Sequence, residues 1–337
     1  MPDLPSAMRA VQLRSYDGKP ESLTLVEAPV PAPGPGQALV KVAASPINPS
    51  DLMFIRGLYG FRKPVPATPG FEGSGTVMAV GGGALAGFLK GKRVACHATD
   101  PATTGGMWAE YIVVPANACV PLRKNIDLEV GAMMLVNPFT AWALVEEARR
   151  EKHKAMVQTA AASALGQMIV RLGKKFGIPT INVVRRNEQV ELLRSAGAKH
   201  VLNSADPGFE AALRELSRQL GATIAFEAVG GELSRRILSA QPKGSRMLVY
   251  GGLSLQPVQA DPGSLIFEGK SVEGFWLSAW LARKSLLARA GLAGQVQKLL
   301  GADLKSPIRA RYPLADVARA LSEYAANMTA GKALLVP

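Results

Sequence analysis

The chain has 337 residues, 48% of them hydrophobic and 19% charged, so we expect one large or two ordinary globular domains. Its formal net charge of +13 is typical of a basic solvated surface, and it equally fits a substrate or cofactor that carries phosphates. Basic residues do not form a stripe interleaved with aromatic residues, and this argues against nucleic acid as a partner.

Residues 1 to about 125 contain short β-branched segments separated by glycine and proline, a pattern that predicts strands and turns. Strands are predicted at 38–46, 73–81, 92–98 and 109–115. Between the first two lies NPSDLMFIRGLYGF, residues 48–61, in which Tyr59 has Gly57 and Gly60 close by. Glycine makes such a loop pliable, so Tyr59 is a candidate functional side chain as well as a candidate rim aromatic.

From about residue 126 the pattern changes to helical spacing and then to alternating strands and helices. Such alternation predicts a parallel, doubly wound sheet. After a helix at 127–150, strands are predicted at 154–161, 179–184, 200–204, 222–229 and 245–252, with helices at 164–177, 187–197, 209–221 and 231–241.

The last part of the chain, from about 267, is mixed again and ends in a helix at 314–328 and a strand at 332–337. We therefore predict an α/β protein of two domains. Residues 1–127, completed by 268–337, would form a β-rich catalytic domain, and 128–267 would form a doubly wound cofactor domain.

The first strand of the alternating part leads into the small-residue turn AAASALG, residues 160–166. A G-x-G-x-x-G fingerprint would place its glycines at Ala161, Ser163 and Gly166, and only the third is glycine. Small residues still let the backbone approach a pyrophosphate, and the helix that begins here offers free N–H groups and its positive dipole end. Gly166 would also permit close packing of the helix. An ordinary turn of small residues is the alternative.

The end of the second strand distinguishes the two nicotinamide cofactors. A site for NAD places an acidic residue about 20 residues after the fingerprint, where it holds the ribose hydroxyls. Here that position is Arg185, followed by Arg186. Because a guanidinium binds a 2′-phosphate that a carboxylate would repel, we predict NADPH, with Asn182 and Arg185 as contacts.

Five segments resemble the zinc-free branch of the medium-chain dehydrogenase/reductase superfamily: SPINPSDLMFIRGLYG, VNPFTAW, TINVVRR, VYGGLSLQPV and SLIFEGKSVEGFWLSAW. The resemblance covers essentially the whole chain. It is closest to mitochondrial-type 2-enoyl thioester reductases, and the zinc-free quinone oxidoreductases come next. It implies a GroES-like catalytic domain, a Rossmann domain that binds NADPH, and a homodimer formed through edge strands of the two Rossmann sheets.

The resemblance also implies roles for individual residues. Tyr59 would be the catalytic tyrosine, and Lys332 would reach back to the cofactor. We also predict Asn48, Trp276 and Trp280 in the substrate pocket, although the two tryptophans could equally be core residues at a domain interface. The remaining residues implied to bind the cofactor are Asn137, Ser163, Ala164, Leu165, Gly166, Asn182, Arg185, Arg186, Tyr250, Gly251, Gly252, Phe275, Trp276, Leu277 and Ser278.

We expect no metal site. Zinc-containing members of the superfamily have a cysteine and a histidine where this chain has Asn48 and Phe71, and they carry four closely spaced cysteines for structural zinc. Cys96 and His97 are adjacent, but a strand would point them to opposite faces. Two cysteines in all cannot build a disulfide framework, and the sequence offers neither a signal peptide nor an apolar run of membrane length, so we expect a cytoplasmic protein.

The predicted reaction is the reduction of a carbon–carbon double bond conjugated to a thioester, with a hydride to Cβ and a proton to Cα from Tyr59, directly or through a water. A phenol is protonated at neutral pH and can act as the acid. Arg62 and Lys63 could meet the phosphates of a pantetheine arm, or form a solvated loop. The handle would be CoA or acyl carrier protein. An NADPH:quinone oxidoreductase is the main alternative, and a non-catalytic NADPH-binding protein is a further one.

Overall fold

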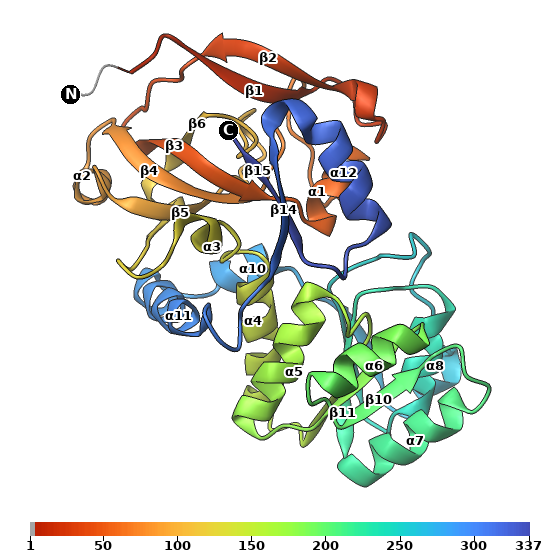
Figure 1. The fold of residues 1–337 in the computed structure, drawn as a ribbon. Helices are drawn as coiled ribbons and strands as arrows, with labels where there is room; N and C mark the ends of the chain where they lie inside the picture. The colour runs from red at the N-terminus through yellow and green to blue at the C-terminus, as the bar shows by residue number, and fades with distance from the viewer. Residues whose placement is uncertain (1–3) are drawn as a thin grey trace. The chain divides into compact units, whose positions relative to one another are not determined.

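The computed structural model describes residues 4–337, which divide into two compact units. Unit 1 comprises the chain up to Val136 together with 290–300 and 306–337, and unit 2 comprises 137–289 and 301–305. Figure 1 follows the chain from red to blue. These boundaries differ from the predicted ones, because unit 1 extends to residue 136 and residues 268–289 belong to unit 2.

Unit 1 is built mainly on antiparallel strands, with β14 and β15 paired in parallel. Strands β1 and β2 form one sheet, and the larger sheet has the order β14-β15-β3-β4-β5-β7, with β6 paired to β3. Strand β15 pairs with β3 and β14, so the tail completes this sheet (Figure 1). The elements are β1 Ala7–Leu13, β2 Leu23–Pro29, β3 Gln37–Pro46, α1 Pro49–Ile55, β4 Glu72–Val80, α2 Ala84–Leu89, β5 Arg93–His97, β6 Tyr111–Pro115, β7 Cys119–Pro121, α3 Leu128–Ala132, β14 Ile308–Pro313, α12 Val317–Ala326 and β15 Lys332–Val336.

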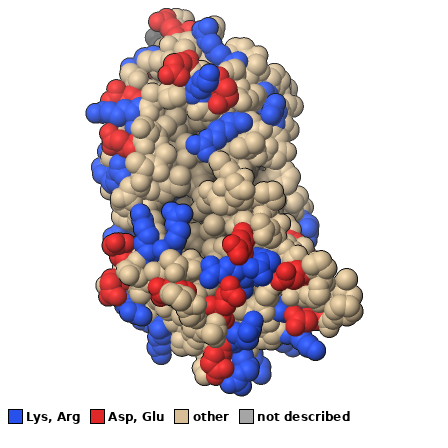
Figure 2. Space-filling model, turned by 90° about the vertical axis from the view of Figure 1, so that its right-hand side faces the viewer, with Lys and Arg blue, Asp and Glu red and all other residues tan. Residues whose placement is uncertain are grey.

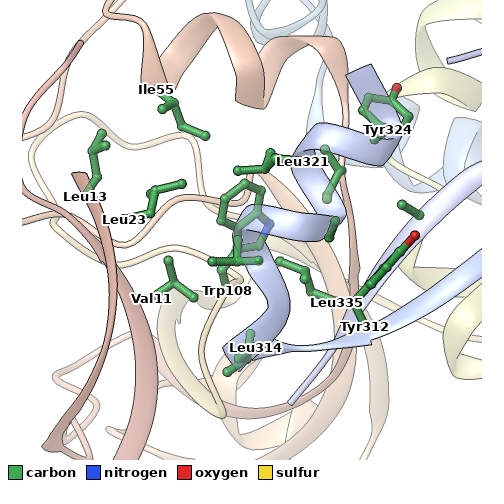
Figure 3. Close-up of a cluster of buried hydrophobic side chains, with 14 of the residues drawn as sticks. Val11, Leu13, Leu23, Ile55, Trp108, Tyr312, Leu314, Leu321, Tyr324 and Leu335 are labelled. Atoms are coloured by element: carbon green, nitrogen blue, oxygen red, sulfur yellow. The ribbon is translucent and has the colours of Figure 1, made fainter. Parts of the chain in front are cut away.

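One hydrophobic core of unit 1 joins its first strands to its last helix. Trp108 is fully buried in the middle of this cluster, between Leu13 and Leu23 on one side and Leu321 and Leu335 on the other (Figure 3). The loop after α1 packs against the same cluster through Tyr59. Segments that are far apart in the sequence therefore support this loop.

Unit 2 contains a six-stranded parallel sheet in the order β10-β9-β8-β11-β12-β13. This order corresponds to 3-2-1-4-5-6, the arrangement of dinucleotide-binding sheets, with the topological switch point between β8 and β11. The elements are α4 Asn137–Arg150, β8 Ala155–Gln158, α5 Ala164–Phe176, β9 Thr180–Val184, α6 Asn187–Ser195, β10 His200–Asn203, α7 Phe209–Leu220, β11 Ala222–Glu227, α8 Glu232–Ala240, β12 Arg246–Val249, α9 Pro262–Ile266, β13 Ser271–Gly274 and α10 Leu277–Ala282; α11 Leu286–Leu299 contributes to both units.

Both faces of this sheet are buried. Consecutive residues of a strand point to opposite faces, and Val183 belongs to one hydrophobic cluster with Phe209 and Leu213, whereas Val184 belongs to another with Leu193. The predicted doubly wound α/β sheet is thus confirmed. The sixth strand, β13, adds to the edge of the sheet beside β12 and explains why residues 268–289 belong to unit 2.

The helix predicted over 127–150 is two helices, α3 and α4, separated at 133–136. The backbone N–H groups of Leu135 and Val136 donate to the carboxylate of Glu72, at 2.8 and 2.9 Å. Glu72 lies on β4, so a tertiary contact captures the groups that a continuous helix would use internally.

Charged side chains are mixed over the face shown in Figure 2, where Lys and Arg are interspersed with Asp and Glu over its lower part. Among the ion pairs of the structure, Arg246 contacts both Glu151 and Glu273. Among residues 4–337, no helix is long and apolar enough to cross a membrane.

Candidate active site

The loop after α1 places the ring of Tyr59 against two phenylalanine rings. Its ring centroid lies 4.6 Å from that of Phe71 and 5.1 Å from that of Phe61, the latter edge to face. Gly57 has a φ of +67°, and a Cβ there would lie 2.8 Å from Arg62 Nη2. The loop thus requires a glycine at position 57, whereas Gly60 has open space around it. Tyr59 is half-buried, with its ring held by packing.

The far end of this loop is fixed by Lys63. Its buried ammonium donates to the carbonyls of Ala98, at 3.0 Å, and Gly105, and its backbone exchanges two hydrogen bonds with the Tyr16 hydroxyl. Burial lowers the pKa of Lys63 to about 8. The suggestion that Lys63 meets a substrate phosphate is therefore wrong, because its charge is turned inward. Arg62 is exposed but donates to the Gly57 carbonyl at 3.1 Å.

Behind the loop, Asn48 joins two buried charges. Its Nδ2 donates to Glu72 Oε1 at 2.9 Å, and its Oδ1 accepts from Lys332 Nζ. All three side chains are buried. Asn48 is fully buried, and the Lys332 ammonium is turned toward Asn48 inside unit 1; the pocket and cofactor roles of these two residues remain predictions.

Asp51 holds the start of α1 in the same cluster. Its Oδ2 accepts from the Asn48 backbone N–H at 2.8 Å, and its Oδ1 accepts from the Phe71 N–H at 3.1 Å. The second of these bonds connects the cap of α1 to the residue on which the Tyr59 ring packs. Sequence reasoning missed Asp51 and Glu72; the capping pattern N-P-S-D was the available signal for the first.

Burial dominates the electrostatics of this cluster. It raises the pKa of Asp51 to about 7 and raises the pKa of Glu72, which the Lys332 charge partly offsets. Burial also lowers the pKa of Lys332, against the opposing effect of the two carboxyl groups. Lys332, Asp51 and Glu72 thus share one buried site.

No group of three or more His, Cys, Asp or Glu residues arranged to hold a metal occurs within residues 4–337. Cys96 is buried and His97 is exposed on the same strand, so the two side chains point to opposite faces. Asn48 and Phe71 stand at the positions that the resemblance assigns to zinc ligands in zinc-containing members. In the structure, the Asn48 amide bonds to Glu72 and Lys332, and the Phe71 ring packs against Tyr59.

In unit 2, the turn after β8 matches the packing predicted for a pyrophosphate turn. Ser163 caps α5, its Oγ accepting from the Gly166 N–H at 3.1 Å. A Cβ on Gly166 would lie 2.4 Å from the Ala161 carbonyl oxygen, which confirms that this position needs glycine. Ala160 has a left-handed φ of +49°, a conformation that favours glycine. The chain therefore forms the turn with alanine at a strained position.

Arg185 and Arg186 lie exposed where β9 ends and α6 begins. Within the described chain, neither guanidinium has an ion pair or hydrogen bond, and Arg185 uses only its backbone N–H, toward Gln189. Both charges are thus available to an anion. Asn182, predicted as a contact, is instead buried and bonded to Gln158, Thr180 and His200, so its amide is structural.

Sequence reasoning also missed Glu227, at the carboxyl end of β11. Its Oε1 accepts from the backbone N–H groups of Val229 and Gly230, whereas its buried Oε2 has no hydrogen-bond partner in the described chain. The buried hydroxyl of Tyr250, a predicted cofactor residue at the end of β12, also has none. Ligands of open parallel sheets bind at the carboxyl edge, and two buried polar atoms without a hydrogen-bond partner lie there. A ligand is therefore expected to contact them. Burial raises the pKa of both groups.

The predicted segment 275–280 divides into two environments. Trp276 is half exposed and precedes α10, next to Phe275, whose N–H donates to the Val249 carbonyl at 2.8 Å. Trp280 is buried and its Nε1 donates to Glu147 on α4 at 2.8 Å, with the Lys284 ammonium over its ring. Trp280 is therefore packed within unit 2, and its place in a substrate pocket remains a prediction. The other predicted cofactor residues, among them Asn137 at the start of α4, remain predictions.

Two family models match the chain: the alcohol dehydrogenase GroES-like domain over residues 34–124, and the zinc-binding dehydrogenase domain over residues 164–290. The chain is 34% identical to the mitochondrial enoyl-[acyl-carrier-protein] reductase of Arabidopsis thaliana, over 79% of this chain and 71% of the relative. It is 31% identical to that of Rattus norvegicus, over 94% and 85%.

Solved structures match nearly the whole chain. A provisionally named NADPH:quinone reductase from Mesorhizobium loti is 40% identical, with a TM-score of 0.90 and coverage of 99% of this chain and 100% of that one. A mycobacterial protein solved as a complex with NADPH is 25% identical, with a TM-score of 0.82 and coverage of 98% and 100%.

The chain therefore belongs to the medium-chain dehydrogenase/reductase superfamily, in its zinc-free branch. The predicted resemblance and the predicted fold class are confirmed. As a member of this branch the chain is an oxidoreductase, and the matching relatives are reductases.

Proposed function

We propose that this protein is an NADPH-dependent reductase of trans-2-enoyl thioesters. The observation that carries the proposal is Tyr59, half-buried on a glycine-dependent loop and packed between Phe61 and Phe71. A phenol held in that way has a defined position from which it can give a proton to the carbanion-like Cα of an enolate, directly or through one water.

The residues of unit 2 fit NADPH. The 3-2-1-4-5-6 sheet has an α5 N-terminus capped by Ser163, free guanidinium groups on Arg185 and Arg186, and orphaned polar atoms on Glu227 and Tyr250. The two arginines favour a 2′-phosphate over bare ribose hydroxyls. The chemistry that bound NADPH supplies is hydride transfer, to Cβ of the substrate.

Tyr59 would complete the reduction at Cα. The proton leaves the Tyr59 hydroxyl and forms the new C–H bond, and the phenolate is reprotonated from solvent. Asp51 and Lys63 act as positioning residues: the first holds Phe71 through its backbone N–H, and the second fixes the end of the loop. Hydrogen-bond donors from the backbone would stabilise the enolate oxygen.

The thioester handle would be CoA or acyl carrier protein. Both carry phosphates, which suits a chain with a net charge of +13. The curated relatives are named for reduction of enoyl groups on acyl carrier protein, and this favours the carrier as a partner. We propose a cytoplasmic location, because two cysteines are too few for a disulfide framework and this fits a reducing compartment.

An NADPH:quinone oxidoreductase is the second candidate, favoured by the 40% identity to the provisionally named Mesorhizobium loti quinone reductase. Quinones are strongly electrophilic, and they accept a hydride without needing a side chain to protonate a carbon atom. The two candidates therefore differ in how much they require the Tyr59 hydroxyl.

The test is NADPH oxidation, followed by absorbance, with a medium-chain trans-2-enoyl-CoA and an ortho-quinone, for wild type and Tyr59→Phe. We expect the enoyl thioester to turn over and the variant to lose about 10²–10⁴-fold in that activity. The variant should retain its quinone rate within a few-fold. Turnover of the quinone alone, unchanged by the substitution, would establish the second candidate. Tyr59 would then only line the site, and its hydroxyl would take no part in the reaction.

A further inference from the structure

The only two cysteines of the chain face each other across two adjacent strands. Cys96 on β5 and Cys119 on β7 are direct partners in the antiparallel register, and their Sγ atoms lie 3.7 Å apart. Both are free thiols, Cys96 completely buried and Cys119 8% exposed on the last strand of the sheet.

The hydrogen-bond pattern shows which kind of cross-strand pair this is. The Leu122 N–H donates to the Arg93 carbonyl at 2.9 Å, so these two residues form a hydrogen-bonded pair. Such pairs alternate along an antiparallel ladder, which makes Cys96 and Cys119 a non-hydrogen-bonded pair. Their β-carbons are then at the closer of the two spacings, near the separation that a disulfide requires.

We propose that Cys96 and Cys119 are a redox-modification site that forms a reversible intrachain disulfide with a hydroperoxide as oxidant. The Cys119 sulfur attacks the terminal peroxide oxygen, the O–O bond breaks, and water or an alcohol leaves. The Cys96 sulfur then attacks the resulting sulfenic acid at sulfur and releases water. Two thiols and one hydroperoxide give one disulfide, one alcohol and one water; when the peroxide is hydrogen peroxide, both small products are water.

The order of attack follows from the local chemistry. The Cys96 thiol donates to Cys119 and is buried, and both effects raise the pKa of Cys96. Cys119 is the more accessible of the two and accepts that hydrogen bond. It is therefore the thiol that meets the oxidant first, and Cys96 is the resolving thiol.

The bond would close a loop that contributes to the Tyr59 site. Ala98 and Gly105, whose carbonyls hold the Lys63 ammonium, lie between the two cysteines. So does Trp108, the centre of the hydrophobic cluster in Figure 3. A disulfide at the base of this segment restricts its unfolding and raises the thermal midpoint.

The experiment exposes the native protein to hydrogen peroxide, denatures it in N-ethylmaleimide and measures the intact mass and the linked peptides. We expect neither cysteine to be alkylated, so that the mass is two hydrogen atoms below that of the unalkylated reduced protein. The peptide map should contain one linked pair joining Cys96 to Cys119, and dithiothreitol should reverse the change fully. Oxidised glutathione should give the same product more slowly.

Cys119→Ser is the control and should keep one alkylatable thiol, with no linked peptide. The peptide map of the wild type needs no variant, so a poorly folded control does not compromise the test. The proposal is overturned if both thiols still alkylate after peroxide and after oxidised glutathione, or if a sulfinic acid accumulates in place of the disulfide.

Discussion

Asp51 shows what a single residue contributes in unit 1. Its carboxyl group is fully buried, accepts two backbone hydrogen bonds, and has a pKa raised to about 7 by burial. This carboxyl group therefore ionises near neutral pH, and it accepts a hydrogen bond from the backbone of Phe71, against which the Tyr59 ring packs. The adjacent Glu72 has its pKa raised for the same reason.

The raised pKa of Asp51 predicts how the stability of the fold changes with pH. Between about pH 4 and 7 the folded state holds a proton on Asp51 that the unfolded chain has lost, so the free energy of unfolding decreases as pH rises through this window, by up to about 4 kcal/mol. Asp51→Asn should flatten the slope, with the Glu72 contribution left in place. Urea unfolding at several pH values measures it.

The control for that experiment is Asp17→Asn. Asp17 is a solvent-exposed acid whose pKa is lowered to about 2, mainly by the Lys19 backbone N–H. Its contribution is lost as pH falls and has the opposite sign, so this substitution should leave the slope between pH 4 and 7 unchanged. A slope unchanged by Asp51→Asn would show that Asp51 is ionised throughout.

Among the elements, the junction of β9 and α6 is where the proposed preference for NADPH can be tested. A helix start normally favours acidic side chains, because the dipole is positive there. Here two arginines occupy it, exposed and without ion pairs in the described part of the chain. An anion placed between them would relieve the unfavourable charge, and the NADPH phosphate provides one.

Replacing both Arg185 and Arg186 by serine should raise the KM for NADPH by about 10- to 100-fold, the loss expected for one or two charge-assisted hydrogen bonds. The KM for NADH should hardly change. Initial rates with the two cofactors give the ratio. Arg194→Ser is the matched control on the same helix, where the arginine pairs with Glu191 at 3.3 Å; an equal effect there would indicate general charge and not a phosphate site.

For the whole molecule, we expect the homodimer that the family resemblance implies. Strand β13 is an edge of the parallel sheet and pairs only with β12 in the described chain. Ile266 and Phe267, just before it, are 70% and 79% exposed. An open edge flanked by large apolar side chains is typical of a surface that another copy covers.

Phe267→Asp should shift the protein toward monomer, because a charge would be buried in the interface. Light scattering coupled to size exclusion measures the mass over a concentration series. Phe88→Asp is the control, since Phe88 is a 57% exposed aromatic on α2 of unit 1. A wild type that is monomeric at all concentrations, or equal effects of the two substitutions, would remove β13 as the interface.

The sequence by itself determined the fold class, the alternation of unit 2 and the small-residue turn before α5. These features depend on local periodicity, on glycine and proline, and on residues close together in the chain. The same is true of Arg185 and Arg186, whose distance from the turn is fixed by one strand and one helix. The glycines around Tyr59 also marked its loop as a candidate site, and the catalytic role of Tyr59 remains a prediction.

Only the tertiary structure decided the roles of the buried polar residues. Asn48 and Lys332 are separated by most of the chain and meet because β15 pairs with β3. The sequence left Trp280 open between a substrate pocket and a packed core; in the structure it is buried, and Glu147 on another helix accepts its N–H. A buried polar group must find a partner, and the partner is supplied by whichever segment packs against it. Such pairings depend on the assembled sheets and not on local sequence, which is also why the Cys96–Cys119 contact emerged only from the strand register.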